Sequence, residues 1–259
     1  MNILVTGASS GIGAALARAL AARGDTVGLV ARREDRLNTV LTECIGASPN
    51  SQRWVADLED LDRAQAVALE AWDAFGGLDV LVNNAAIPQV SHVTKLALSE
   101  VERQMRVNYL SPVAMTMAVL PRMLERGSGT IVNVGSVGGR LGIGRETAYS
   151  GAKFALSGWS EALALDLWET GVNVKLVTPG AVDTEIWTHP DVEPTDYDGD
   201  KASPEAVAAE IVPFLTDDRF EICPPESQGM AAIIKGKSND VDAFLKGTAA
   251  WEAQARAKG

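Results

Sequence analysis

A glycine-rich turn between an apolar strand and an alanine-rich helix constrains the fold of this chain more than any other feature. The short apolar run Asn2 to Thr6 leads into the turn, and the stretch Ala14 to Ala22 follows it. The turn reads Gly7, Ala8, Ser9, Ser10, Gly11, Ile12 and Gly13. Glycines let the backbone turn sharply and approach a pyrophosphate, whose charge meets free N–H groups and the positive end of the helix. Because of its place after a strand, the turn predicts a nucleotide-binding site; without that context such a turn is more often structural.

Strands and helices alternate along the rest of the chain. Further strands are expected at Thr26 to Ala31, Arg53 to Ala56, Asp79 to Asn83, Thr130 to Val134, Val172 to Thr178 and Phe220 to Cys223. Helices are expected from about Arg33 and over 61–75, 99–126, 149–168, 204–215 and 239–258. Ser99 with Glu102 forms a capping-box pattern at the start of one of them. The alternation implies crossover connections, and hence an α/β fold with a doubly wound, Rossmann-type, mostly parallel sheet and helices on both faces.

Composition and charge narrow the classes of partner. The formal net charge of −11 argues against a surface that holds nucleic acid or anionic lipid. No apolar run approaches the roughly eighteen residues that span a bilayer, and no secretory signal precedes the first strand. Cys44 and Cys223 fit neither a disulfide framework nor a zinc site, and the two histidines add too few ligands for a metal centre. We therefore expect a cytoplasmic protein with free thiols, no metal, no nucleic-acid partner and no membrane partner.

Tyr149 and Lys153 form the strongest candidate for catalysis. They are four residues apart in a predicted helix, so both side chains project from one face. A free tyrosine has a pKa near 10, and a fixed cation beside it stabilises the phenolate and lowers that pKa. The pair is therefore suited to acid-base chemistry on a substrate oxygen, although the same spacing also occurs by chance.

The glycine spacing and these motifs together resemble the short-chain dehydrogenase/reductase family, in its compact single-domain branch. The turn Thr6-Gly7-x-x-x-Gly11-x-Gly13 differs from the commoner GxGxxG fingerprint and is the form typical of that family. The resemblance extends over about residues 2–186. It implies that Tyr149 transfers the proton, that Ser136 holds the substrate oxygen, that Lys153 also bonds the nicotinamide ribose, and that the carbonyl of Asn108 helps to position a water connected to Lys153. Without the resemblance, Ser136 would be a turn residue and Asn108 merely a tolerated residue inside a helix.

The resemblance also implies a complete set of cofactor contacts. Asp57 and Leu58 resemble the adenine contact, although Asp57 is equally compatible with a helix cap. Asn84 and Ala85, in the segment Asn83 to Ala86, resemble the stretch beside the adenine ribose. The segment after the sixth strand resembles the part that binds the nicotinamide carboxamide. The cofactor-binding residues expected in this way are Gly7, Ser9, Ser10, Gly11, Ile12, Gly13, Arg32, Arg33, Asp57, Leu58, Asn84, Ala85, Tyr149, Lys153, Pro179, Gly180, Val182 and Thr184.

The end of the second strand favours NADP(H) over NAD(H). An acidic residue there would accept hydrogen bonds from the ribose 2′-hydroxyl, but this chain offers Ala31-Arg32-Arg33. Arg32, helped by Arg33 and Ser9, can form a charge-assisted pair with a 2′-phosphate. The alternative is that both arginines belong to a solvated helix start balanced by Glu34 and Asp35.

These features predict an oxidoreductase that transfers a hydride between NADP(H) and a carbonyl or secondary alcohol. A sugar-nucleotide epimerase or dehydratase is opposed by the glycine spacing and by the lack of a larger C-terminal substrate domain. A non-catalytic cofactor sensor or scaffold of the same fold is a further alternative, although such proteins tend to lose the tyrosine or the lysine. The sequence does not identify the substrate.

The chain organisation completes these expectations. Residues 1–259 are expected to form a single cofactor-binding and catalytic domain. The acidic, proline-containing stretch 185–202 is expected to be a substrate lid, and residues 238–259 a helical extension. A homo-oligomer, either a dimer or a tetramer, is expected.

Overall fold

Apolar runs in the sequence form the strands of a parallel sheet in the computed structural model, which describes residues 1–188, 192–193, 197 and 199–256. Within these residues the sheet has seven strands in the order β3-β2-β1-β4-β5-β6-β7, all parallel. The strands are β1 (Asn2–Thr6), β2 (Thr26–Ala31), β3 (Gln52–Val55), β4 (Val80–Asn83), β5 (Gly129–Val134), β6 (Val172–Val177) and β7 (Glu221–Ile222). The order reverses between β1 and β4, which is where parallel α/β sheets bind ligands.

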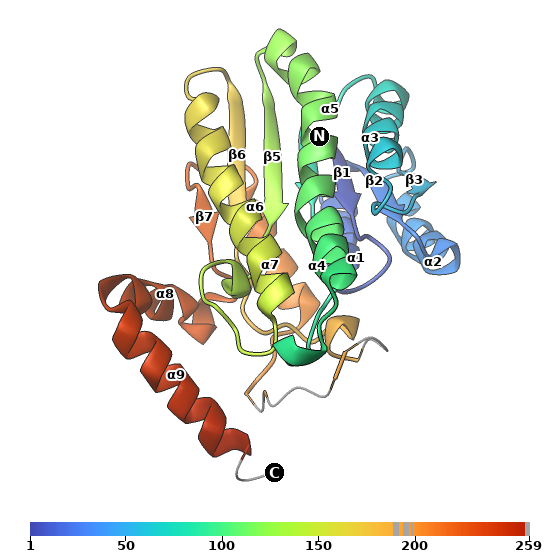
Figure 1. Ribbon diagram of the computed structural model, residues 1–259. Coiled ribbons are helices and arrows are strands. Elements are labelled where there is room, and N and C mark those ends of the chain that lie inside the picture. The colour runs from blue at the N-terminus through green and yellow to red at the C-terminus, as the bar shows by residue number, and fades with distance from the viewer. Residues whose placement is uncertain (189–191, 194–196, 198, 257–259) are drawn as a thin grey trace.

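Helices cover both faces of this sheet (Figure 1). The helices are α1 (Gly11–Ala22), α2 (Glu34–Ile45), α3 (Leu61–Phe75), α4 (Leu98–Met105), α5 (Ser111–Arg126), α6 (Thr147–Asp166), α7 (Pro204–Phe214), α8 (Met230–Asn239) and α9 (Val241–Arg256). Helices α1, α2 and α7 pack on one face, and α3, α5 and α6 on the other. The expected doubly wound α/β fold is therefore confirmed.

The alternation of side chains along each strand creates two cores. In β1, Ile3 and Val5 pack with Leu16 of α1, whereas Leu4 packs on the opposite face with Val67 of α3. All five side chains are fully buried. Each stabilises the fold by roughly 1.5–3 kcal/mol relative to an exposed position. Burial on both faces explains why the strands lack polar alternation.

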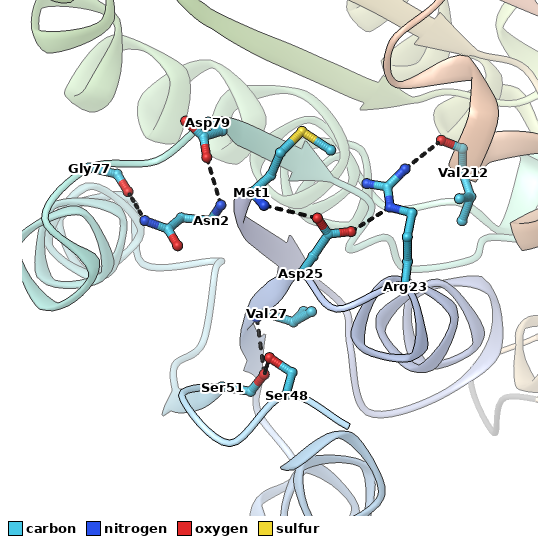
Figure 2. A network of polar contacts seen from close by, with 10 residues as sticks. All are labelled: Met1, Asn2, Arg23, Asp25, Val27, Ser48, Ser51, Gly77, Asp79 and Val212. Atoms are coloured by element: carbon cyan, nitrogen blue, oxygen red, sulfur yellow. Dashed lines mark hydrogen bonds and ion pairs between the residues drawn. The ribbon is translucent and has the colours of Figure 1, made fainter. Parts of the chain in front are cut away.

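Polar contacts fix the amino end of β1, as Figure 2 shows. The main-chain N–H of Asn2 donates to Asp79 Oδ2 at 2.7 Å, and its side-chain amide donates to the Gly77 carbonyl at 3.1 Å. Beside them, Arg23 Nε donates to Asp25 Oδ2 at 2.6 Å. These contacts anchor the ends of β1, β2 and β4 that lie opposite the ligand-binding edge.

The expected helix 99–126 contains an interruption. A π-helical turn, Arg106–Leu110, separates α4 from α5 and contains Asn108. The capping-box prediction for Ser99 and Glu102 is wrong. Helix α4 begins at Leu98, and the Glu100 carboxylate accepts from the Ala97 N–H at 2.8 Å. The capping carboxylate is therefore that of Glu100, two residues before the predicted Glu102.

The C-terminal region also differs from the expectation. The helix expected over 239–258 is present as α9, and a further helix that was not expected, α8, precedes it; Figure 1 shows both beside the carboxyl-end side of the sheet. Asp240 separates them, and its Oδ1 accepts from the Ala243 N–H at 2.9 Å. Within the expected lid, residues 189–191, 194–196 and 198 lie outside the described residues. Among the helices that the structure describes, none has the length and apolar character that crossing a membrane requires.

Candidate active site

A cleft of about 510 Å³ lies along the carboxyl ends of the strands. Its walls come from the residues that directly follow strands, such as Gly7 after β1, Arg32 after β2 and Asn84 after β4. Every predicted site residue lines it except Gly13 and Asn108. Those that line it are Gly7, Ser9, Ser10, Gly11, Ile12, Arg32, Arg33, Asp57, Leu58, Asn84, Ala85, Ser136, Tyr149, Lys153, Pro179, Gly180, Val182 and Thr184.

The glycine turn requires glycine at three positions for two physical reasons. Gly7 and Gly11 have positive φ angles of 66° and 53°, a conformation that side chains disfavour. Gly13 instead packs closely, since a Cβ atom there would lie 2.5 Å from both Asn84 Nδ2 and the Gly7 carbonyl oxygen. The turn thus opens the first turn of α1, whose N–H groups have no helical partners, toward the cleft.

The ends of β1 and β4 are joined through Thr6 and Asn84. Thr6 Oγ1 accepts from the N–H groups of Asn84 and Ala85 at 2.8 and 2.9 Å. Asn84 Nδ2 donates in turn to the Thr6 carbonyl at 2.8 Å. The side-chain amide of Asn84 therefore holds the cleft wall in place.

Arg33 is the arginine closest to the glycine turn. Its guanidinium donates to Ser10 Oγ at 2.7 Å and to Ser9 Oγ at 3.3 Å. Arg32 lies on the other side, 3.9 Å from the Asp57 carboxylate, and its side chain is half exposed. Both cations therefore stand at the cleft end that the sequence assigns to the adenosine part of a cofactor.

Glu185 lies at this end of the cleft, next to Arg33. Its carboxylate accepts from Arg33 Nη1 at 2.6 Å and also pairs with Arg36. These hydrogen bonds, first that of Arg36 and then that of Arg33, lower the pKa of Glu185. Glu185 and Arg33 are 152 residues apart in the chain, so no local sequence signal could have paired them.

Tyr149, Lys153 and Ser136 converge on one wall of the cleft. Helix α6 carries Tyr149 and Lys153, and Ser136 lies immediately before the 3₁₀ turn Val137–Gly139. The Tyr149 hydroxyl shares a hydrogen bond with the Ser136 side chain. Lys153 Nζ lies 5.8 Å from the centre of the Tyr149 ring and donates to the Val134 carbonyl at 2.9 Å.

Burial shifts both pKa values of the pair on α6. Burial raises the pKa of Tyr149, which the hydrogen bond with Ser136 opposes and the charge of Glu146 reinforces. Burial also lowers the pKa of Lys153 from 10.5 to about 8. The expectation that Lys153 makes the Tyr149 phenol more acidic is wrong in this structure, because the cost of burying a phenolate dominates. Near neutral pH the phenol is protonated and most of the lysine is charged.

The segment after β6 also lines the cleft. The Pro179 carbonyl accepts from the Val137 N–H at 2.9 Å, which ties this segment to the serine loop. Gln228 brackets Ala181 by accepting from its N–H at 3.0 Å and donating to its carbonyl at 2.9 Å. Thr184 lies against the glycine turn, since a Cβ atom on Gly11 would be 3.0 Å from Thr184 Cγ2.

Comparisons with known proteins match this geometry to one family. The profile of the family described as short chain dehydrogenase matches residues 1–193. The chain belongs to the short-chain dehydrogenase/reductase family. It is therefore expected to be an oxidoreductase, in agreement with the glycine turn and the Tyr149–Lys153 pair.

Relatives within this family differ in name. The chain is 35% identical over 181 residues to "Ketoacyl reductase HetN" of Nostoc sp., in a match that spans 70% of this chain and 63% of that protein. It is 33% identical over 239 residues to "Galactitol 2-dehydrogenase" of Agrobacterium fabrum, which spans 92% and 91% of the two chains.

Solved structures of the family share the fold. The short-chain dehydrogenase of Sphingobium yanoikuyae in complex with NADPH has a TM-score of 0.79 and 27% identity, covering 92% of this chain and 95% of that chain. A family member from Burkholderia phymatum in complex with NAD has a TM-score of 0.83 at 23% identity, covering 93% of this chain and 94% of that chain, which shows a common fold. Neighbours in this short-chain dehydrogenase family thus bind either nicotinamide cofactor.

Asn108 lies behind the cleft, fully buried in the π-helical turn. Its Oδ1 accepts from the Ile87 N–H at 2.9 Å, and its Nδ2 donates to the Ile87 carbonyl at 3.0 Å. Nδ2 also donates to Gln104 Oε1 at 2.6 Å. The side chain therefore holds Ile87, which lines the cleft.

The cleft also contains two polar residues that the sequence analysis missed, Glu146 and Gln89. Trp187, from the stretch expected to form the lid, lines the cleft as well and stacks on Tyr197 with ring centres 5.5 Å apart. The position of Glu146 at the start of the helix that carries Tyr149 was the available signal.

Proposed function

We propose that this short-chain dehydrogenase transfers a hydride between NADP(H) and a carbonyl or secondary alcohol. The observation that carries the proposal is the convergence of Tyr149, Ser136 and Lys153 on the cleft that the glycine turn opens. A ketoacyl reductase and a galactitol dehydrogenase among the relatives support carbonyl reduction and alcohol oxidation as the reaction type.

The residues around the glycine turn fit a dinucleotide. The glycines let the turn pack against Asn84, since a Cβ atom on Gly7 or Gly13 would lie 2.9 or 2.5 Å from its Nδ2, and the first turn of α1 offers N–H groups to a pyrophosphate. Asp57 and Leu58 would bind the adenine, Asn84 and Ala85 would lie beside its ribose, and the segment Pro179 to Thr184 would hold the carboxamide. When bound, the nicotinamide gives up or accepts the hydride.

The side chains on α6 and before the 3₁₀ turn manage the substrate oxygen. In reduction, the carbonyl carbon gains the hydride and the C=O π electrons move to oxygen. The Tyr149 hydroxyl then supplies the proton, and Ser136 Oγ stabilises the developing charge by a hydrogen bond. The raised pKa of Tyr149 keeps this proton available near neutral pH. In oxidation, the same groups act in reverse.

The preference for NADP(H) rests on Arg32 and Arg33. A 2′-phosphate at this end would form charge-assisted hydrogen bonds with one or both guanidinium groups, and the residue directly after β2 is Arg32 rather than the carboxylate that would bind a 2′-hydroxyl. We expect kcat/KM to be higher with NADPH than with NADH. A preference for NADH would contradict this assignment.

The substitution Tyr149→Phe tests the reaction. It removes the proton donor and should lower kcat about 10²- to 10⁴-fold, while the dissociation constant of NADPH measured by fluorescence stays nearly unchanged. Tyr109→Phe is the matched control, because Tyr109 does not line the cleft and should retain activity. If wild type bound NADPH but turned over no carbonyl or alcohol, a sensor or scaffold role would replace this proposal.

The outer face of α5 and the end of α6 support a homo-oligomer. Leu110, Met117 and Leu124 are exposed at seven-residue intervals, and Leu165 and Trp168 are 74% and 75% exposed. Apolar side chains repeated on one helix face are typical of protein interfaces. Light scattering should give a dimer or tetramer mass, and Met117→Glu should shift it toward the monomer.

A further inference from the structure

One side chain from the region after β7 holds the cleft segment that follows β6. Gln228 ends the 3₁₀ turn Glu226–Gln228, which lies between β7 and α8. Its side-chain amide accepts from the Ala181 N–H at 3.0 Å and donates to the Ala181 carbonyl at 2.9 Å. The same amide donates to the Asp200 carbonyl at 3.4 Å. Ala181 lines the cleft and Gln228 does not, so Gln228 acts on the cleft through Ala181.

The residue before Ala181 is a glycine for a reason that involves the same amide. A Cβ atom on Gly180 would overlap Gln228 Oε1 and lie 3.0 Å from Gln228 Cδ. The Gly180 N–H donates to the Pro224 carbonyl at 3.0 Å. The region after β7 therefore contacts two successive residues of the cleft segment, and the closest of these contacts requires a glycine.

The next residue, Val182, has a main-chain donor that faces the cleft side. The Ala202 N–H donates to the Ala181 carbonyl at 2.9 Å, and the Asp183 N–H donates to the Ala202 carbonyl at 2.8 Å. Successive peptide groups of an extended segment face opposite sides, so the Val182 N–H faces away from Ala202. Among the described residues this N–H has no hydrogen-bond acceptor, and Val182 lines the cleft. The Val182 N–H is therefore available to a bound ligand.

Hydride transfer makes the position of this donor important. A displacement of about 1 Å in the bound geometry can lower a rate about 10²-fold. The Pro179 carbonyl accepts from the Val137 N–H at 2.9 Å, which holds the start of the segment against the serine loop. The contacts of Gln228 with Ala181 hold the part of the segment that directly precedes the Val182 donor.

We propose that Gln228 is a positioning residue for the nicotinamide, because its two hydrogen bonds with Ala181 fix the direction of the Val182 N–H. This inference rests on the proposed function, since it assumes that the carboxamide binds the segment Pro179 to Thr184. Gln228 lies beyond residues 1–193, which match the family profile. The inference therefore makes the region after β7 part of the framework of the active site.

The first experiment separates the two halves of the cofactor by calorimetry. The ligands are NADPH and adenosine 2′,5′-bisphosphate, which lacks the nicotinamide, with NADH and ADP as a parallel pair. Gln228→Ala removes the hydrogen bonds of the amide, and Gln228→Glu keeps the acceptor for the Ala181 N–H but cannot donate to its carbonyl. Ser227→Ala is the control, because Ser227 is the exposed neighbour in the same turn.

The loss of the amide should affect only the nicotinamide half. Gln228→Ala should weaken NADPH binding about three- to tenfold and lower kcat about ten- to a hundredfold. Binding of the bisphosphate should stay within about twofold of wild type, because its phosphates meet the glycine turn and the arginines. Gln228→Glu should fall between wild type and Gln228→Ala, and Ser227→Ala should match wild type.

The second experiment uses the fit between Gly180 and the amide. Gly180→Ala in wild type should lower kcat/KM at least about a hundredfold, because the new Cβ atom overlaps Gln228 Oε1. In the Gln228→Ala background the same substitution should cost less than about tenfold, since the overlapping atom is absent. Equal losses in both backgrounds would overturn the inference.

Three further results decide between the inference and its rivals. A folded Gln228→Ala with the kcat and NADPH affinity of wild type would overturn the inference and leave the proposed function intact. A lower melting temperature with an unchanged ratio of the two dissociation constants would assign Gln228 a structural role only, and would also overturn it. If wild type turned over no carbonyl or alcohol, the proposed function would fall, and the ratio of dissociation constants would still test Gln228. If Gln228→Ala did not fold, the same ratio in Gln228→Glu would decide.

Discussion

The buried ammonium of Lys153 should lower the stability of the protein near neutral pH, and this effect can be measured apart from catalysis. Lys153 is 2% exposed, and its single described hydrogen bond is donated to the Val134 carbonyl at 2.9 Å. The substitution Lys153→Met keeps a chain of similar length and removes the charge. It therefore isolates the free energy of burying the ammonium.

The size of the effect follows from the pKa. The pKa of Lys153 falls from 10.5 to about 8 in the folded protein, so burying the charged form costs about 3 kcal/mol near pH 7. Lys153→Met removes that cost but leaves the Val134 carbonyl without its donor, which costs about 1–3 kcal/mol. Near pH 7 the variant should thus be about as stable as wild type or slightly more stable, while its activity is lost.

The change of stability with pH is a more direct test of the argument than the net stability at pH 7. Between the two pKa values the unfolded state binds more protons than the folded state, so the unfolding free energy of wild type rises with pH. Between about pH 7 and about pH 9.5, wild type should gain about 2 kcal/mol relative to Lys153→Met.

Urea unfolding followed by circular dichroism at both pH values measures this gain. Lys235→Met is the control, because Lys235 is exposed on α8 and its loss should leave the difference from wild type unchanged with pH. Parallel pH profiles for wild type and Lys153→Met would refute the argument, since they would mean that burial does not lower the pKa of the lysine.

Three further predictions concern the cofactor end and the pH profile. Glu185→Gln removes the carboxylate partner of Arg33 and should strengthen NADPH binding, measured by calorimetry, up to about fivefold while NADH binding stays constant. An equal change in the binding of both nucleotides would contradict this prediction. Gly13→Ala places a Cβ 2.5 Å from Asn84 Nδ2 and should weaken both nucleotides at least about tenfold, whereas Gly142→Ala, with no atom near its Cβ, should not. The kcat/KM for reduction should fall above about pH 8 as Lys153 loses its proton. The same fall in the pH profile of Glu146→Gln would show that titration of Glu146 does not cause it.

The sequence predicted the elements whose signals are local. The strand β1, the glycine turn and α1 could be predicted because apolar runs and glycines act over a few residues. Predicted site residues other than Gly13 and Asn108 line one cleft for a related reason: most of them lie in the segments that follow strands, and parallel strands end at the same edge of the sheet, whereas Tyr149 and Lys153 reach it from α6.

The features that were missed depend on contacts distant in sequence or on burial. The Glu185–Arg33 pair joins segments 152 residues apart, so spacing could not reveal it. The π-helical turn contains Asn108, whose side chain bonds Ile87 in another segment, a contact that local sequence does not reveal. The pKa direction of Tyr149 was wrong because the sequence gives the neighbouring charge of Lys153 but not the burial of the phenol.

Burial also orders the protonation states of the catalytic pair. In water, tyrosine and lysine lose their protons at similar pH values, near 10. In this protein the pKa of Tyr149 rises and that of Lys153 falls to about 8, so the lysine loses its proton first and the phenolate–ammonium pair is disfavoured. A protonated phenol beside a charged lysine is the state that donates a proton to a carbonyl oxygen. For the proposed reaction, this order of protonation favours the direction of reduction near neutral pH.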